Sequence, residues 1–292
     1  MTNYIAAIEA GGTKFNCAVL DRSRAIVSEH RIATTTPEQT LSEVVAFFNT
    51  QREKGFDFAQ MGVASFGPLD LHPESETFGF ITATPKPHWS NTDLANHLAK
   101  ALDCRVTLDT DVNGAALAEY LWGAAQNTKV SVYVTIGTGV GGGVIVNGQP
   151  LHGLIHPEVG HMYIGDIDGI KGACPFHGSC VEGLASGTAM REIWGVPAEQ
   201  LPSDHRAWQV QADVLAAMCH NLMMTLSAEV IVLGGGVMNK PGLLENVRRS
   251  LAKRLANYLQ LPKSTSLEQL IVLPGLADKA GIYGAYALAT SR

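Results

Sequence analysis

Residues 132–147 constrain the fold more than any other stretch, because two apolar runs flank a turn crowded with glycine. The first run, 132–136, leads into the sequence GTGVGGG, and the second run follows at 144–146. Both runs are rich in β-branched residues, so the pattern predicts a strand, a turn and a strand. Backbone N–H groups of such a turn can converge on a phosphate, joined by the hydroxyls of Thr135 and Thr138. An ordinary glycine-rich hairpin accounts for the same residues equally well.

The glycines of this turn also match a dinucleotide-binding pattern. Gly137, Gly139 and Gly142 have the spacing G-x-G-x-x-G. That fingerprint requires a helix directly after the turn and an acidic residue about 20 positions further on. Residues 144–146 favour a strand instead, so the sequence argues against a Rossmann site.

A second strand–turn–strand unit opens the chain. Apolar runs at 4–8 and 15–20 flank a turn, residues 9–14, that carries a carboxylate, two glycines, a hydroxyl and a lysine. Lys14 could meet a phosphate as a point charge, and Glu9 could act on Mg²⁺ directly or through its waters. A charged β-turn is the alternative interpretation. The two hairpins predict a weak internal repeat in which each opens one α/β half.

The composition bounds the class of protein. The chain has 292 residues, of which 46% are hydrophobic and 16% charged, and its formal net charge is −6. These values fit a soluble globular protein with a substantial core. The negative balance argues against general binding to nucleic acid or to a membrane surface. Because Glu9 interrupts the first apolar run, we expect no signal peptide and a cytoplasmic protein.

One carboxylate lies at a position suited to catalysis. The predicted strand 105–108 delivers Asp109, Thr110 and Asp111, and an alanine-rich helix follows over 114–122. Ligands of open α/β sheets bind at the carboxyl ends of strands. Asp111 is therefore either the N-cap of the helix or a catalytic group, and the helix dipole favours the ionised form that a base requires.

A cluster of cysteine and histidine predicts a metal site. Cys174, His177 and Cys180 have the spacing C-x2-H-x2-C, and His161 lies 13 residues upstream of Cys174. Thiolate and imidazole are the donors of tetrahedral zinc, and four protein donors predict a structural site. The alternative is a free cysteine pair with solvated histidines.

A third group of glycines joins a strand to a helix. Residues 229–233 predict a strand that ends in Gly234 and Gly235, and a helix is predicted over 243–259. A nucleotide could bind at this turn, although a tight connection without a ligand explains it equally well.

Taken together, these motifs resemble the ROK family of sugar kinases, within the actin/hexokinase-like ATPase superfamily. The resemblance rests on five motifs in the family's order: the turn 9–14, the segment 109–116, the turn 135–143, the E-x-G-H sequence 158–161, and the zinc loop 174–182. It implies an α/β fold of two domains with an active-site cleft between them. We expect a small domain of residues 1–113 plus 278–292 with the first hairpin. A larger domain, 114–277, would carry the second hairpin and the zinc loop.

Three departures from many ROK hexokinases resemble the fructokinase branch. They are Glu9, Thr110 and the spacing Cys174-Pro175-Phe176-His177, and residues 84–89 (TPKPHW) share this likeness. The resemblance therefore implies D-fructose as the sugar, and if fructose is turned over fastest, Thr110 and Lys86 become the residues to test for sugar specificity.

The resemblance assigns roles residue by residue. It implies ATP-dependent phosphorylation of fructose at its 6-hydroxyl, with Asp111 as general base, a structural zinc, Mg²⁺ with ATP, and a homodimer. The sugar contacts would be Gly67, Pro68, Thr110, Glu158, His161 and Glu182. The ATP contacts would be Gly11, Gly12, Thr13, Lys14, Gly137, Thr138, Gly139, Gly234 and Gly235. The zinc ligands would be His161, Cys174, His177 and Cys180.

Two other functions remain open at this stage. A ROK kinase could act on mannose, glucose or an N-acetylated amino sugar. Some ROK proteins are sugar-responsive repressors with an added N-terminal helix-turn-helix. We disfavour this reading because the first predicted strand starts at residue 4.

Overall fold

The computed structural model describes residues 3–262 and 264–291, which fold into two compact units. The first comprises Met1–Ala118, His152–His156 and Asp278–Arg292, and the second comprises Glu119–Leu151 and Pro157–Ala277. Two bounds differ from those expected. The units divide after Ala118, within the continuous helix α3 (Asp111–Trp122), where the sequence placed the division after residue 113, and residues 152–156 group with the first unit.

A five-stranded sheet in the order β3-β2-β1-β4-β7 forms the centre of the first unit. The first three strands of that order are antiparallel, and β4 and β7 continue the sheet parallel to β1. The strands are β1 Tyr4–Ala10, β2 Lys14–Asp21, β3 Ile26–Ala33, β4 Phe58–Ser65 and β7 Arg105–Thr110. Nearly every residue of β1 is buried, as expected for a strand covered on both faces.

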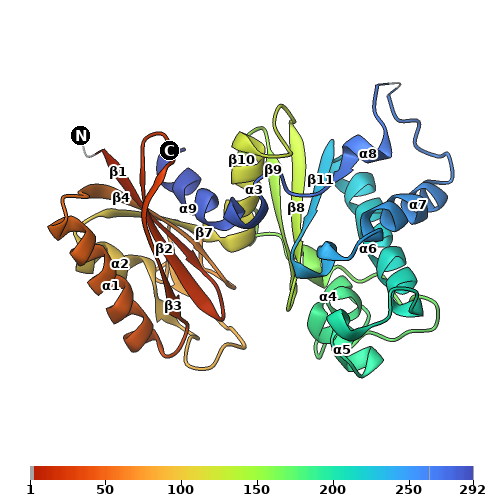
Figure 1. Cartoon of the computed structure of the whole chain (residues 1–292), viewed down its shortest axis with the longest axis horizontal. Coiled ribbons are helices and arrows are strands. Elements are labelled where there is room, and N and C mark those ends of the chain that lie inside the picture. Colours follow the sequence, from red (N-terminus) through yellow and green to blue (C-terminus); the bar gives the residue numbers. More distant parts are fainter. Residues whose placement is uncertain (1–2, 263, 292) are drawn as a thin grey trace. The chain divides into compact units, whose positions relative to one another are not determined.

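Helices cover both faces of this sheet (Figure 1). On one face, α1 (Pro37–Glu53) and α2 (Ala95–Leu102) contribute Phe48 and Leu98 to a core cluster that includes Val63 of β4. The other face is covered by α9, described next. Two short strands, β5 (Phe80–Ile81) and β6 (Thr92–Asp93), pair within the connection between β4 and α2.

Helix α9 (Ala280–Thr290) lies directly on the backbone of the sheet. A Cβ atom at Gly62 of β4 would lie 1.7 Å from the carbonyl oxygen of Ala285, so only glycine allows this approach. The small residues of α9 therefore serve close packing.

The second unit has a sheet of the same design, in the order β10-β9-β8-β11-β12. Again the first three strands are antiparallel and the last two run parallel to the central one. The strands are β8 Val130–Ile136, β9 Val140–Val146, β10 Gln149–Pro150, β11 Val230–Gly234 and β12 Ile271–Val272. The predicted internal repeat is thus present in the backbone topology.

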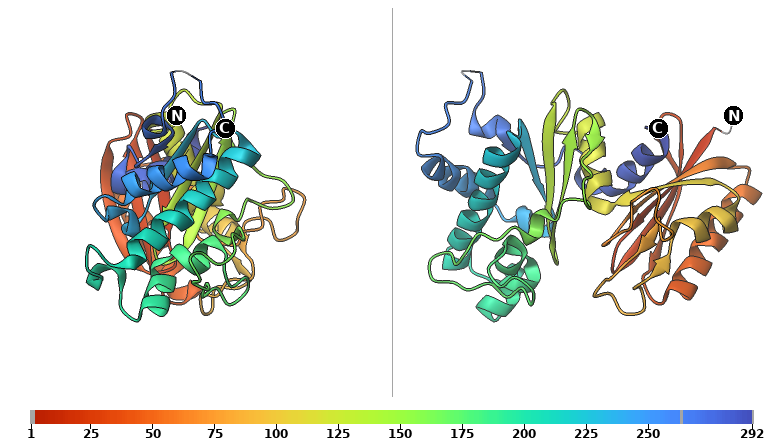
Figure 2. Two further views of the ribbon diagram at one scale, coloured as in Figure 1. Left: turned by 90° about the vertical axis from the view of Figure 1, so that its right-hand side faces the viewer. Right: turned by 180° about the vertical axis from the view of Figure 1, so that it is seen from behind.

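Most helices of the second unit lie on one side of its sheet (Figure 2). They are α4 Val181–Ala185, α5 Gly187–Trp194, α6 Arg206–Leu226, α7 Leu243–Leu255 and α8 Leu267–Leu270. Short 3-10 helices occur at Val159–His161, Ala198–Gln200 and Gly236–Asn239. A fourth, Ala277–Lys279, lies where the chain passes from the second unit back to the first. Leu215 of α6 and Leu251 of α7 join Ile231 of β11 in a single core cluster.

A buried carboxylate joins distant parts of the chain within the second unit. Glu119 of α3 is fully buried, and its two oxygens accept from the backbone N–H groups of Ala124, Gly275 and Leu276 at 2.7 to 2.9 Å. Three donors compensate for the desolvation of the charge. The segment before α9 is therefore fixed to α3.

Within residues 3–262 and 264–291, no helix is both long enough and apolar enough to cross a bilayer.

Candidate active site

The turn of the first hairpin is fastened by a threonine from the end of β3. Gly11 donates its N–H to the Lys14 carbonyl at 2.9 Å, which closes the turn. The Thr34 hydroxyl donates to the Gly11 carbonyl at 2.7 Å, and the Thr34 N–H donates to the Thr13 carbonyl at 3.0 Å. Gly12, Thr13 and Lys14 are exposed at the tip. The predicted phosphate contacts at the tip of this turn are therefore accessible to solvent, and the backbone of the turn is held by hydrogen bonds from Thr34.

The carboxylate of Glu9 is held at the base of the same hairpin. Asn16 donates its side-chain amide to Glu9 Oε2 at 2.7 Å. A Cβ at Gly281, in the first turn of α9, would come within 2.2 Å of Glu9 Oε1. The sequence pattern pointed to Glu9 but not to Asn16. In the antiparallel pairing of β1 with β2, Asn16 lies directly opposite Glu9, where cross-strand side chains interact.

The segment 84–89 supports the first hairpin indirectly. Lys86 Nζ donates to the Thr34 carbonyl at 3.1 Å, and the indole N–H of Trp89 donates to the Thr35 carbonyl at 2.7 Å. Trp89 is fully buried, with its ring 5.4 Å from that of Phe15. Lys86, which we expected to set sugar specificity, is thus tied to the residue that fastens the hairpin turn.

The second hairpin is fastened by the start of α5. Gly137 donates to the Gly139 carbonyl at 2.9 Å within the turn. Gly187 then donates its N–H to the Gly137 carbonyl at 2.7 Å, and the Thr188 hydroxyl donates to the Thr138 carbonyl at 2.8 Å. Thr138 is exposed at the tip, as its counterparts in the first hairpin are.

A cavity of about 770 Å³ lies beside this second hairpin. Arg191 and Lys240 give it positive charge, and the Lys240 ammonium lies 4.8 Å from the centre of the Trp208 ring. Its lining consists of Gly137, Thr138, Gly187, Thr188, Arg191, Pro197, Ala198, Glu199, Leu201, Ser203, Trp208, Gly236, Val237, Asn239 and Lys240. Sequence reasoning missed Arg191, Trp208 and Lys240, because residues scattered over two helices and a loop form no local motif.

Gly234 and Gly235 lie next to this cavity along the chain but are not part of its lining. A Cβ at Gly235 would come within 2.4 Å of the Ile136 carbonyl oxygen, and one at Gly234 within 2.9 Å of the Tyr133 hydroxyl. These two glycines allow the chain to leave β11 against β8. The next residue, Gly236, reaches the cavity wall.

Asp111 begins helix α3 at the end of the buried strand β7. The hydroxyl of Thr110 accepts the N–H of Asn113 at 3.1 Å, which is the capping interaction of a helix N-terminus. The Asp111 carboxylate accepts the N–H of Val112 at 2.9 Å. Of the two roles that the sequence allowed for Asp111, the capping role therefore belongs to Thr110.

Gly67 and Pro68 directly follow the neighbouring strand β4 in the same unit. They lead into Leu69, whose N–H donates to Nε2 of the buried His156 at 3.4 Å. Pro68 and Leu69 also line a second cavity of about 300 Å³ together with residues 152–156. Strands β4 and β7 are parallel neighbours, so Gly67 and Asp111 both follow the carboxyl ends of these strands, at the same end of the sheet.

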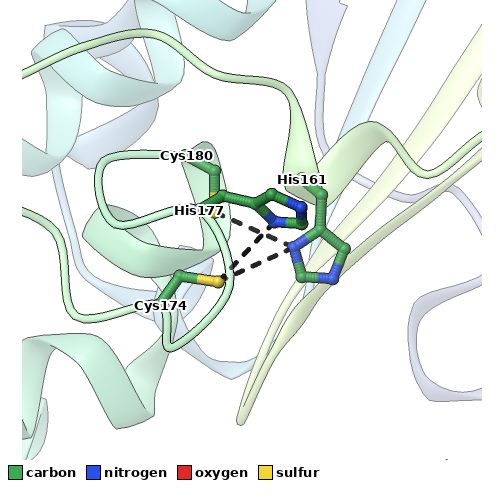
Figure 3. Close-up of side chains that lie close together, drawn as sticks. All are labelled: His161, Cys174, His177 and Cys180. Carbon is green, nitrogen blue, oxygen red and sulfur yellow. Dashed lines mark hydrogen bonds between the residues drawn. The ribbon is translucent and has the colours of Figure 1, made fainter.

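Four predicted zinc ligands converge in the second unit (Figure 3). His161 Nδ1 lies 4.0 Å from Cys174 Sγ and 3.8 Å from Cys180 Sγ, and His177 Nδ1 lies 3.8 Å from Cys174 Sγ. Zinc bonds of 2.0 to 2.3 Å in a tetrahedron place neighbouring ligand atoms about 3.3 to 3.8 Å apart. The four donors are of the types that bind tetrahedral zinc, and their ligand atoms lie within 4.8 Å of one another, which is wider than the spacing around a bound ion. Burial raises the pKa of the Cys180 thiol, so a metal would displace its proton on binding.

Glu182 connects the metal cluster to the second hairpin. Its Oε2 accepts the N–H of Val140 at 2.9 Å, and its Oε1 lies 3.9 Å from His161 Nε2. His161 thus turns one ring nitrogen to the thiols and the other to Glu182. A Cβ at Gly160 would lie 1.8 Å from the Val140 carbonyl oxygen, so the E-x-G-H segment, which Glu158 begins, packs directly on β9.

The predicted residues accordingly form two groups, one in each unit. The first unit holds the first hairpin, Gly67, Pro68, Thr110 and Asp111. The second unit holds the second hairpin, Gly234, Gly235, Glu158, Glu182 and the four metal donors.

Comparison with known proteins identifies the class. The paired sheets, each with its glycine hairpin, belong to the two-domain actin/hexokinase-like α/β fold. The crystal structure of a ROK hexokinase from Thermus thermophilus matches with a TM-score of 0.79 and 27% identity, covering 98% of this chain and 97% of that chain. The chain belongs to the ROK family, whose pattern it matches over residues 5–292.

Two curated relatives are similar over nearly their full length. The chain is 48% identical to a fructokinase of Zymomonas mobilis subsp. mobilis, covering 97% of this chain and 95% of that protein. It is 40% identical to a fructokinase of Lactococcus lactis subsp. cremoris, covering 99% of each. The resemblance stated from the sequence motifs is thereby confirmed for the fold and the family.

Proposed function

We propose that the protein is an ATP-dependent fructokinase, which transfers the γ-phosphoryl group of ATP to the 6-hydroxyl of D-fructose. The observation that carries this proposal is the 48% and 40% identity to two fructokinases over nearly the whole chain. Asp111 and the first hairpin in the first unit, and the second hairpin and the cavity in the second unit, each support it.

Asp111 is the proposed general base. Its place in the first turn of α3 exposes it to the positive end of the helix dipole, which favours the ionised carboxylate. Since Thr110 already caps the helix, the cap does not require a carboxylate at position 111. The base would accept the hydroxyl proton of the sugar as that oxygen approaches the γ-phosphorus in line.

ATP, as its magnesium complex, is the proposed ligand of the cavity beside the second hairpin. A volume of about 770 Å³ suits a nucleotide. Trp208 offers an aromatic face to a base, and Arg191 and Lys240 offer positive charge to phosphates. Gly234 and Gly235 would act by placing Gly236 in the wall. The remaining phosphate contacts are proposed from Gly11, Gly12, Thr13, Lys14, Gly137, Thr138 and Gly139.

The proposed sugar contacts come from both units. They are Gly67, Pro68 and Thr110 of the first unit and Glu158, His161 and Glu182 of the second. The Thr110 hydroxyl uses a lone pair for the cap, and its hydrogen can still be donated to a sugar oxygen.

Zinc is the proposed metal of the cysteine and histidine cluster, held by His161, Cys174, His177 and Cys180. It would supply rigidity to the loop and orient the His161 ring. Because Nδ1 of that ring faces the thiols and Nε2 faces Glu182, the ring could hold metal and sugar with different nitrogens.

A cytoplasmic homodimer is the proposed state of the protein, on the strength of the family likeness alone. Sedimentation velocity of the purified protein tests the dimer, and a monomer at micromolar concentration would contradict it.

A coupled ADP-release assay tests the function. Purified protein is given saturating ATP and Mg²⁺ with fructose, mannose, glucose or N-acetylmannosamine in turn. Fructose is expected to give a kcat/KM well above the other three. Faster turnover of another sugar would keep a ROK kinase but overturn the fructokinase proposal. Absence of ADP release with all four sugars would favour a sugar-binding protein without kinase activity.

A further inference from the structure

Residues 152–156, here called the strap, are a five-residue segment of the first unit whose flanking residues, Leu151 and Pro157, belong to the second. Two histidines fasten the strap within the first unit. His152 contacts Asp109, and His156 accepts the N–H of Leu69. Neither histidine was singled out by a motif, and neither has a role in the reaction as proposed so far.

The first contact that holds the strap is between His152 and the buried carboxylate of Asp109. The Asp109 side chain is 2% exposed, and His152 Nε2 lies 3.1 Å from its Oδ2 and 3.2 Å from its Oδ1. An ionised carboxylate only accepts hydrogen bonds, so Nε2 of His152 carries the proton and donates it. Buried charges require such donors, and the bond is strengthened by the low local dielectric.

The same carboxylate organises the first turn of α3. Asp109 Oδ1 accepts the N–H of Thr110 and the side-chain amide of Asn113, each at 2.7 Å. Among the residues that the structure describes, Oδ1 of Asn113 has no hydrogen-bond donor, and the amide nitrogen lies 2.7 Å from Asp109 Oδ1 and 3.4 Å from His152 Nε2, so Asp109 is the acceptor that orients this amide. Asp111 lies between Thr110 and Asn113. The carboxylate that His152 supports therefore holds both sides of the proposed base.

The second fastening holds the turn after β4. His156 is 6% exposed, and its Nε2 accepts the Leu69 N–H at 3.4 Å. Nε2 also lies 3.8 Å from the position of a Cβ built at Gly67. The ring of His156 thus packs against the turn that contains Gly67 and Pro68, which are proposed sugar contacts.

From these contacts we propose that His152 and His156 are positioning residues of the kinase reaction. His152 acts through Asp109 on the orientation of Asp111, and His156 acts through Leu69 on the Gly67–Pro68 turn. The inference rests on the proposed function, because it assigns the base and the sugar turn the roles given above. It predicts that the two histidines affect different kinetic constants.

Conservative and apolar replacements separate positioning from packing. His152→Gln retains a side-chain N–H that can donate to Asp109, whereas His152→Leu has a similar volume and no donor. His152→Leu is expected to lower kcat about 10- to 100-fold with little change in the KM for fructose, since small misplacement of a catalytic group has effects of this size. His152→Gln is expected to restore most of the lost kcat.

The partner of His152 gives an independent measurement. Asp109→Asn should lower kcat by at least the same factor, because Asp109 also accepts from Thr110 and Asn113. The double variant with His152→Leu should lose little more than Asp109→Asn alone, because the bond between the two side chains is already broken. If the two losses multiply, or if His152→Leu keeps the kcat of the unaltered protein, the positioning role of His152 is wrong. Should His152→Leu fail to fold, the comparison of His152→Gln with His152→Asn, whose amide is shorter, decides the same point.

The role of His156 is tested by the KM for fructose. His156→Leu removes the acceptor of the Leu69 N–H and is expected to raise the KM for fructose about tenfold while kcat stays within about threefold. His156→Gln, whose side-chain oxygen can accept, should lie closer to the unaltered protein. Equal effects on kcat and KM in all His156 variants would overturn this half of the inference.

His97→Leu is the matched control, because His97 is an exposed residue of α2 outside the strap and its contacts. Its kinetics should equal those of the unaltered protein. If the unaltered protein turns over none of the four sugars, the proposed function is wrong, and the inference that rests on it is wrong as well. If it phosphorylates fructose while the strap variants behave like His97→Leu, only the inference fails.

Discussion

The two hairpins occupy the same place in two sheets of the same strand order, yet they are fastened by different means. In the first unit, a threonine side chain and backbone from the end of β3 hold the turn. In the second unit, the start of α5 holds the turn, and Glu182 accepts an N–H at the start of β9. The repeated feature is the backbone topology, and the residues that fix each turn are local to its own unit.

This difference explains why the repeat is weak in the sequence. The topology requires apolar strands joined by a glycine-containing turn, and both hairpins satisfy that requirement. It does not require Glu9, Lys14 or Thr138 to have equivalents in the other half. The following predictions test how far the two halves are independent.

The largest effect is expected from Asp111→Asn in the first unit. Loss of a general base typically lowers kcat by about 10² to 10⁴. ATP binding should be retained, because the proposed nucleotide cavity is lined by residues of the second unit. Steady-state kinetics and calorimetric titration with ATP measure the two properties. Unchanged turnover would remove Asp111 as the base.

A glycine substitution in each half should differ sharply in its effect on stability. Gly160→Ala places a Cβ 1.8 Å from a backbone oxygen of β9 and should cost about 3 kcal/mol of unfolding free energy or more. Gly12→Ala meets no heavy atom within 4 Å and should change stability by less than about 0.5 kcal/mol. Urea unfolding measures both. Equal costs would contradict the packing of the E-x-G-H segment against β9.

Metal removal should affect the second unit and spare the first. Cys180→Ser is expected to abolish stoichiometric zinc and to lower the Tm by several degrees, because metal binding contributes folding free energy. Cys104→Ser, a half-buried cysteine of the first unit, is the control. Elemental analysis and thermal unfolding are the measurements. Native protein purified without chelators and found free of zinc would refute the proposed metal.

The two threonines that fasten the turns form a matched pair. Thr34→Val removes a donor to the Gly11 carbonyl at a site that is 7% exposed, and about 1 to 2 kcal/mol should be lost. Thr188→Val removes the equivalent donor to the Thr138 carbonyl at an exposed site, where water can replace it, so about 0.5 kcal/mol is expected. A larger loss at Thr188 would reverse the comparison.

The smallest effect is expected from Lys86→Met. Lys86 donates to the Thr34 carbonyl, so its loss should loosen the first hairpin and raise the KM for ATP by about twofold to fivefold. The ratio of kcat/KM for fructose and mannose should stay constant. A changed sugar ratio with an unchanged ATP KM would restore the specificity role that the sequence suggested for Lys86.

Sequence patterns predicted the parts of this protein that depend on local chemistry. Alternating β-branched runs and glycine turns gave both hairpins, and C-x2-H-x2-C with His161 gave four donors that the structure brings together. The helix after β7 was also expected, although it begins at Asp111 and not at residue 114. Capping by Thr110 accounts for this earlier start.

The remaining features depend on contacts between distant residues. No spacing rule connects Asp109 with His152, which contact each other, or Arg191 with Lys240, which line one cavity, because each pair is brought together only by the folded chain. The strap was assigned to the larger domain for the same reason, since its neighbours in the chain belong there. Such contacts are set by the tertiary fold, and a single sequence carries no periodic signal for them.

The position of α9 has a consequence for the order in which the protein is made. Strands β1 and β4 are synthesised early, but the helix that packs on them begins at Ala280, long after β7 ends at Thr110. A chain emerging from the ribosome therefore carries the five strands of the first sheet with the face around Gly62 uncovered by α9, while the second unit can already pack. Completion of the first unit is a late event, and any arrest of synthesis before α9 leaves an aggregation-prone intermediate.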